Sequence, residues 1–130
     1  MATFSKLALQ PAGTTGDGLG ITVVAIATAG TPIHTASAIP ATIDELWLYA
    51  ANIHSSAVVL TIEYGGVSVT KDLIQQSIAA TPSGLVLVCA GLVVQGNATQ
   101  KVVRAFADTA SKIEIFGFVN MRAVWPSVRK

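Results

Sequence analysis

The chain has few charged residues. Asp, Glu, Lys and Arg make up 12% of the 130 residues, whereas an average soluble domain contains about 25%. A chain with so little charge either hides part of its surface against a partner, often other copies of itself, or is a monomer covered by Ser, Thr and Ala. Composition leaves both alternatives open.

The charges that are present are balanced and scattered. Eight Lys and Arg residues against seven Asp and Glu residues give a net charge of +1, and only Arg129 and Lys130 are adjacent basic residues. Binding to a phosphate backbone requires clustered basic side chains. The distribution therefore argues against nucleic acid as the main partner.

Cysteine and long apolar runs are also scarce. The one cysteine, Cys89, excludes an internal disulfide bond and lies in the run LVLVCAGLVV, where a buried and unreactive thiol is expected. That run is much shorter than the about 20 residues that a transmembrane helix requires. The N-terminal residues MATFSKLALQPAG contain no sustained apolar stretch of the kind found in export signals. We therefore expect no membrane association, and synthesis in a cytosol.

Motifs for catalysis and for metal or cofactor binding are missing. The two histidines, His34 and His54, do not stand with Cys89 at the spacing of a zinc site. No G-x-S-x-G motif is present, and the glycine-rich run GTTGDGLG lacks the Gly-Lys-Ser/Thr of a phosphate-binding loop. His54 is expected in an exposed turn. The sequence thus predicts no enzyme, and no catalytic, metal-binding or cofactor-binding residue.

Strand patterns dominate what is present. Side chains alternate with a period of two in Glu45–Ile53, Ala57–Tyr64 and Lys112–Arg122, which is typical of strands with two distinct faces. The β-branched run Ile21–Thr28 and the apolar segments after the later turns predict further strands. The polar segment Asn52–Ser56 predicts the turn of a β-hairpin.

These patterns define a fold class. Roughly seven or eight strands at spacings of about 8 to 15 residues predict an all-β, single-domain antiparallel β-sandwich. A jelly roll is the natural topology for that number of strands. We assign residues 1–18 to an extended N-terminal arm, 19–122 to the sandwich and 123–130 to a short C-terminal tail, because both ends contain Gly or Pro and show little periodicity.

Aromatic residues are few, at 6% of the chain, but four of them occur in two pairs. Trp47 and Tyr49 share one face of a predicted strand, opposite its leucines, and Phe116 and Phe118 share one face of another, opposite its isoleucines. Large apolar side chains on both faces of a strand leave two alternatives. Either the protein's own second layer covers these aromatic faces, or another subunit does.

Three longer stretches resemble small structural proteins of tailed bacteriophages. They read DELWLYAANIHSSAVVLTIEYGG, DLIQQSIAATPSGLVLVCAGLVV and VVRAFADTASKIEIFGFVNMR, and they cover about residues 44 to 122. The similarity consists of an acidic residue before a W-x-Y strand, an Asn-containing turn, L-T-I-E-x-G-G, a turn related to P-x-S-G-L, and a closing A-F-A…I-x-G-x-V-N. These are strand and turn patterns, so no functional residue carries over from them.

The resemblance implies a virion component, namely a capsid decoration (cement) or head-associated protein on the outer capsid surface. Such proteins are similar to small β-sandwiches and are often trimeric. The implied partners are the major capsid protein and further copies of the chain in a homotrimer, without cofactor, nucleic acid or membrane. The alternative is a head-fibre or tail component that recognises host glycans or proteins with exposed Trp47, Tyr49 or Trp125.

The chain ends supply further candidate contacts. Extended termini can lie across a neighbouring subunit and add strands or insert side chains. Apolar residues of the two ends therefore join the aromatic pairs as candidates. The candidate interface residues are Phe4, Leu7, Leu9, Trp47, Tyr49, Phe116, Phe118 and Trp125.

Overall fold

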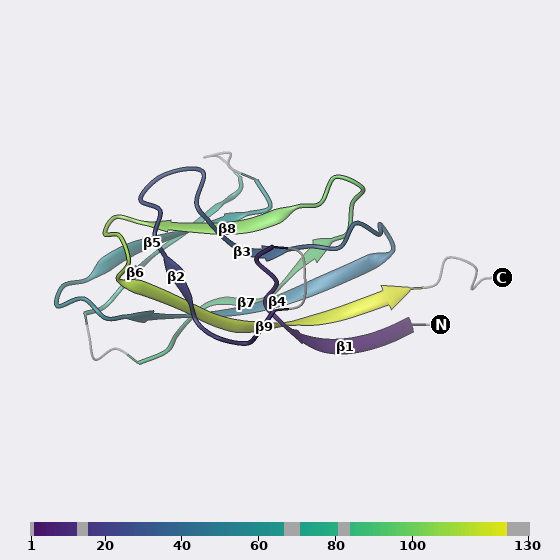
Figure 1. Cartoon of the computed structure of the whole chain (residues 1–130), viewed down its shortest axis with the longest axis horizontal. Helices are drawn as coiled ribbons and strands as arrows, with labels where there is room; N and C mark the ends of the chain where they lie inside the picture. The colour runs from purple at the N-terminus through teal and green to yellow at the C-terminus, as the bar shows by residue number, and fades with distance from the viewer. Residues whose placement is uncertain (1, 13–15, 67–70, 81–83, 125–130) are drawn as a thin grey trace.

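The computed structural model describes residues 2–12, 16–66, 71–80 and 84–124. The described residues form nine β-strands and no helix, and the strands are arranged in two antiparallel sheets (Figure 1). Sheet A contains β1 (Ala2–Ala8), β2 (Ile21–Val23), β4 (Thr42–Asn52), β7 (Val86–Gln95) and β9 (Ile113–Val124). Sheet B contains β3 (Thr31–Thr35), β5 (Val58–Tyr64), β6 (Leu73–Ile78) and β8 (Val102–Ala107). The prediction of an all-β sandwich is confirmed.

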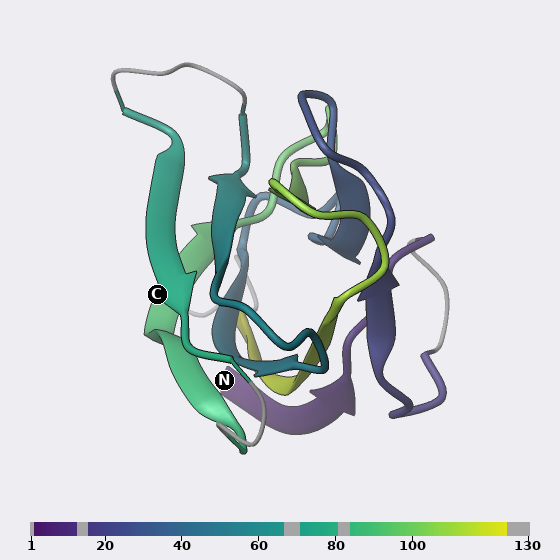
Figure 2. The same ribbon diagram turned by 90° about the vertical axis from the view of Figure 1, so that its left-hand side faces the viewer.

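The order of strands is β1-β9-β4-β7 in sheet A, with β2 also paired to β9, and β3-β8-β5-β6 in sheet B. Figure 2 shows the two sheets as opposite layers around the interior. The order alone does not establish a jelly roll, so that finer topology stays a prediction.

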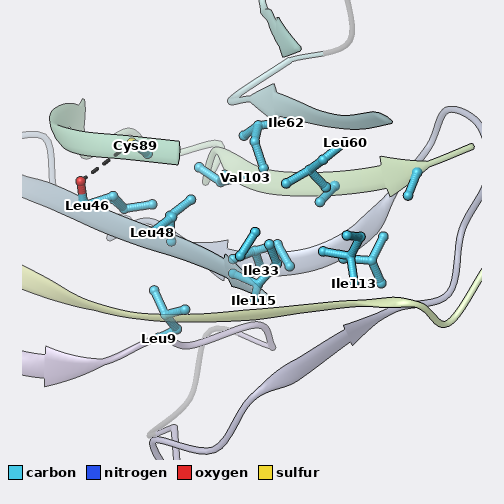
Figure 3. Packing of buried hydrophobic residues seen from close by; sticks show 14 of the residues in the cluster. Leu9, Ile33, Leu46, Leu48, Leu60, Ile62, Cys89, Val103, Ile113 and Ile115 are labelled. Atoms are coloured by element: carbon cyan, nitrogen blue, oxygen red, sulfur yellow. Dashed lines mark hydrogen bonds between the residues drawn. The ribbon is translucent and has the colours of Figure 1, made fainter. Parts of the chain in front are cut away.

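The core lies between the two sheets and follows the predicted alternation. Leu46, Leu48 and Ala50 of β4 are fully buried, while Trp47 and Tyr49 between them are only partly buried. Figure 3 shows residues of sheet A, such as Leu48 and Ile115, facing residues of sheet B across the interior. Each buried aliphatic side chain contributes about 1.5–3 kcal/mol to folding. The inward direction of the leucine face was thus predicted correctly.

The predicted hairpin at Asn52–Ser56 is wrong. β4 belongs to sheet A and β5 to sheet B, so this segment crosses from one layer to the other. The reason is the buried side chain of Asn52, whose Nδ2 donates to the carbonyl oxygens of Ser56, Ile78 and Ala79. These bonds fasten the crossing segment to the end of β6 instead of returning the chain along β4.

The N-terminal residues form part of the sandwich. Residues 2–8 of the expected arm form β1, which pairs with β9 from Ala2 opposite Val124 to Ala8 opposite Phe118. Leu9 follows in the core with 5% of its surface exposed. Apolar residues at the start of the chain therefore complete the fold. The arm and tail positions 13–15 and 125–130 lie outside the described residues.

A loop shortens the strand predicted at 21–28. β2 ends at Val23, and the chain then crosses to the outward side of sheet B. There the fully buried Glu63 accepts hydrogen bonds from the backbone N–H of Gly30, at 2.8 Å, and from the hydroxyl of Thr28. Glu63 is fully buried although it points away from the core, because the loop covers it.

Candidate functional site

The outward side of sheet A carries most of the protein's aromatic residues, and we define it as the outer face. Its side chains point away from the core, because their neighbours in sequence point into it. The outer face consists of Phe4, Lys6 and Ala8 on β1, Phe116, Phe118, Asn120 and Arg122 on β9, and Ile43, Glu45, Trp47 and Tyr49 on β4.

The strand register arranges these side chains in rows across the sheet. Trp47 lies directly opposite Phe118, and Tyr49 lies opposite Phe116. The rings of Trp47 and Phe118 are nearly parallel, with 9° between their planes and 6.2 Å between their centroids. Direct cross-strand pairs of this kind stabilise a sheet by about 0.2–1 kcal/mol each. The aromatic pairs are thus a feature of the surface rather than of the core.

Two cations lie over rings of the same face. The ammonium group of Lys6 is 4.3 Å from the centroid of the Phe118 ring, and the guanidinium of Arg122 is 5.7 Å from that of Phe4. Exposed contacts of this type contribute about 0.5–1 kcal/mol. The ring of Phe4 nevertheless remains 74% exposed. A partner could cover this ring and find a positive charge beside it.

A hollow of about 560 Å³ opens at the Phe4 end of the outer face. It is lined by Phe4, Ser5, Lys6, Ile43, Glu45, Val93, Asn120 and Arg122. Oε1 of Glu45 accepts hydrogen bonds from Nε1 of Trp47 and from Nδ2 of Asn120, both at 2.9 Å. The carboxylate thereby joins the hollow to the aromatic rows.

These hydrogen bonds tune the acidity of Glu45. The bond from Asn120, and after it the bond from Trp47, lower the pKa of Glu45 below its ordinary value of 4.5, and they outweigh a smaller opposing effect of burial. Both donors prefer the ionised carboxylate. Ionised Glu45 therefore holds the indole of Trp47 in place at neutral pH.

A prediction concerns the pH dependence of this contact. Because the pKa in the folded state is lowered, the stabilisation is present above pH 4.5 and is lost as the pH falls through the lower folded value. We expect the fluorescence of Trp47, measured in a Trp125→Phe background, to stay constant above pH 4.5 and to change only in more acidic solution. Glu45→Gln should abolish the transition. A change that occurs above pH 4.5, or that persists in Glu45→Gln, would contradict the assignment.

The outer face gathers five of the eight sequence-predicted interface residues, Phe4, Trp47, Tyr49, Phe116 and Phe118. Of the other three, the two that the structure describes lie elsewhere. Leu7 lies opposite the buried Val119 and packs against the core, and Leu9 belongs to the core. Trp125 lies outside the described residues. The aromatic pairs therefore form one surface, to which the predicted N-terminal leucines do not belong.

The histidines lie away from this surface. His34 is buried, and its Nε2 lies 2.7 Å from Oδ2 of Asp44. The backbone N–H of Gln10 donates to Nδ1 of His34, so Nδ1 carries no proton and Nε2 is the donor to Asp44. The pair fastens the segment after β1 to β3 and β4. His54 lies in the crossing segment after β4, where its Nδ1 accepts the backbone N–H of Ser56.

Two further groups are buried in the sandwich. Cys89 is buried, as predicted, and burial raises the pKa of its thiol. Burial, and after it the negative charges possible on Cys89 and Asp44, raises the pKa of the Tyr64 hydroxyl. Neither group belongs to the outer face.

Within the described ranges, no three or more His, Cys, Asp or Glu side chains gather where they could hold a metal ion. Nor does this part of the chain contain a helix that is long and apolar enough to cross a membrane. Comparisons of the chain with protein-family models, with curated proteins and with solved structures give no match. The outer face therefore has to be interpreted from its own chemistry.

Sequence reasoning missed the polar residues of this surface. Lys6, Glu45, Asn120 and Arg122 line the hollow together with the aromatic Phe4. The period of two does place Glu45 beside Trp47, and Asn120 and Arg122 beside Phe118. It does not tell which strands are neighbours, and only the pairing of β1 and β4 with β9 brings these residues together.

Proposed function

We propose that the protein is a structural component of a bacteriophage virion, a capsid decoration protein that binds the outer capsid surface through the outer face of sheet A. The observation that carries this proposal is the gathering of five predicted interface residues on the outward face of one sheet. Phe4 is exposed there, the other four are partly buried, and no other described strand is stacked on them. The resemblance of residues 44–122 to phage structural proteins supplies the setting. In this role the protein binds and does not catalyse.

The physical basis of the role is repetition. A capsid offers many identical sites, and each decoration protein that spans a boundary between capsid subunits resists their separation. Individually weak contacts act together when the protein is itself an oligomer, because the second contact is then intramolecular. The homotrimer expected from the resemblance would serve this purpose, and it stays a prediction. Rigid aromatic rings that are already in place lose little entropy on binding.

The first test is composition. Purified virions analysed by quantitative mass spectrometry should contain the chain at on the order of hundreds of copies per particle. A particle that lacks the chain would end the proposal.

A second prediction tests the surface. Aromatic residues at the centre of an interface commonly contribute about 2 kcal/mol each, so Phe4→Ala combined with Phe118→Ala should weaken binding to undecorated capsids by about 1,000-fold. The measurement is a titration of purified protein onto capsids. The matched control, Val24→Ala combined with Ile26→Ala, removes exposed apolar residues from the loop after β2 and should bind normally. Equal affinity of the two variants would show that the outer face does not make the contact.

The hollow beside the aromatic rows favours one alternative, a head-fibre or tail module that binds host glycans. Sugar rings stack on aromatic side chains, and Glu45, Asn120 and Arg122 offer hydrogen-bonding groups next to Phe4. A glycan array would show binding that Asn120→Ala removes if this alternative holds. No signal on the array, together with binding to capsids, favours the decoration protein.

A further inference from the structure

One flank of the sandwich carries no charge. From Leu73 to Gln100 the sequence contains no Asp, Glu, Lys or Arg. This segment includes β6 and β7, which are the last strands in the order of sheet B and of sheet A. Figure 2 shows both strands on the left-hand flank of the molecule. A surface without charge is unusual for a protein that meets only water.

The edge of β7 is open. Among the described strands only β4 pairs with β7, so the other edge of this ten-residue strand presents unpaired backbone N–H and C=O groups. Leu87 and Leu92 on the strand are each 44% exposed, and Val93 is 54% exposed. Long apolar edge strands readily pair with a strand of another chain.

Protective features do occur at the other edges. β1 carries the exposed Lys6, and β3 contains Pro32 at an irregularity in its pairing. β2 has only three residues, and β6 has six, preceded by Lys71 and Asp72. Charges, proline and short length all discourage pairing with further strands. β7 has none of these features, although two irregularities interrupt its pairing with β4.

We propose that β7 is a self-association strand, which pairs antiparallel with β7 of a second copy of this chain across a two-fold axis. Near such an axis each residue meets its own copy, so any charge there would face a like charge. The flanks from Leu73 to Gln100 of two copies can come together because neither carries a charge that would repel the other. A partner with a charged surface would find no opposite charge on it. The chemistry of the flank therefore fits a second copy.

This pairing makes the oligomer a dimer in place of the homotrimer that the resemblance implies, and it does not depend on the capsid-binding role of the outer face. The part of β7 from Leu92 to Gln95 keeps a continuous register with β4, so its free edge is regular enough to accept another strand. Pairing there would join sheet A of one subunit to sheet A of the next, with both outer faces on the same side of the combined sheet. A dimer would then present two aromatic faces to one capsid surface.

The test begins with the mass of the purified chain in solution. Light scattering after size exclusion should give twice the 13.4 kDa of one chain. Leu87→Lys combined with Leu92→Lys places like charges on the edge and should halve the measured mass. The matched control, Val24→Lys combined with Ile26→Lys, adds the same charges to exposed apolar positions on the loop after β2 and should remain a dimer. A wild-type monomer or trimer, or a dimer unaffected by the β7 lysines, would overturn the inference.

Cross-linking gives a readout that does not depend on those variants folding. Single cysteines introduced at Leu92, Val93 or Gln95 should yield a disulfide-linked dimer under mild oxidation at one or more of these positions. Cysteine at Ile26 should not, and the buried native Cys89 cannot take part. No cross-link at any β7 position would also overturn the inference. If purified virions lack the chain, the proposed function is wrong, whereas the measurements of mass and cross-linking in solution are unaffected.

Discussion

Replacing Asn52 by alanine is expected to lower the free energy of unfolding by about 2–4 kcal/mol, because several buried backbone groups lose their partner at once. Asn52 is 3% exposed. Its Nδ2 lies 3.0 Å from the carbonyl oxygens of Ser56 and Ile78 and 3.1 Å from that of Ala79. Its Oδ1 accepts the backbone N–H of His54 at 2.8 Å. One side chain thus joins the segment after β4 to the end of β6.

Two further variants separate this explanation from a simple loss of volume. Asn52→Asp keeps nearly the same shape but turns a donor into an acceptor that faces three carbonyl oxygens, so it should destabilise at least as much as alanine at neutral pH. Asn97→Ala removes an exposed side chain whose Oδ1 accepts the backbone N–H of the nearby Thr99, and it should cost about 0.5 kcal/mol or less. Urea denaturation measures all three variants. A cost for Asn52→Ala no larger than for Asn97→Ala would contradict the role given to Asn52.

The sequence predicted the strands well where the side chains alternate. The run from Glu45 to Ile53 has leucines at even-numbered positions and aromatic residues at odd-numbered positions, and β4 buries its leucines as expected. Such a pattern depends only on neighbouring residues, so it can be recognised in the sequence without knowledge of the fold. β1 and β3 were missed because their patterns are weak, and because Pro32 argues against a strand except at an edge, which is where β3 lies.

The assignment of strands to sheets could not be predicted in the same way. Alternation indicates which side chains share a face, but it does not identify the neighbouring strand. The segment Asn52–Ser56 has the length and polarity of a hairpin turn, and the bonds of Asn52 to Ile78 and Ala79 that make it a crossing join residues far apart in sequence. Interactions of this range leave no local signal.

In the candidate site, too, only the features that lie within one strand could be predicted. Both aromatic pairs were identified from the alternation, since each pair lies on one strand. The positions of Lys6 over Phe118 and of Arg122 over Phe4 depend on the register of β1 against β9. The sequence offered no means to choose that register before the strand itself was known.

Gly117→Ala is expected to lower the free energy of unfolding by more than about 3 kcal/mol. Gly117 lies in β9 opposite Leu48 of β4, at the centre of sheet A. A Cβ atom there would lie 2.1 Å from the carbonyl oxygen of Trp47 and 3.2 Å from the Cα of Leu48. Both are backbone atoms, which cannot swing aside as a side chain can. Overpacking usually costs about 1–3 kcal/mol, and a clash with the backbone of the central strand pair should exceed that range.

Gly84→Ala provides the control for backbone conformation. Gly84 has a φ of +69° but open space around a would-be Cβ atom, so alanine there should cost only the strain of that conformation, about 1–2 kcal/mol. Gly117 lies between Phe116 and Phe118, so its close approach to β4 also sets the spacing of the aromatic rows. We therefore expect Gly117→Ala to alter the fluorescence of Trp47 in the Trp125→Phe background, whereas Gly84→Ala leaves it unchanged. The prediction is wrong if Gly117→Ala and Gly84→Ala lose similar stability and neither changes the fluorescence of Trp47. In that case β4 and β9 separate enough to admit the methyl group without disturbing the aromatic rows.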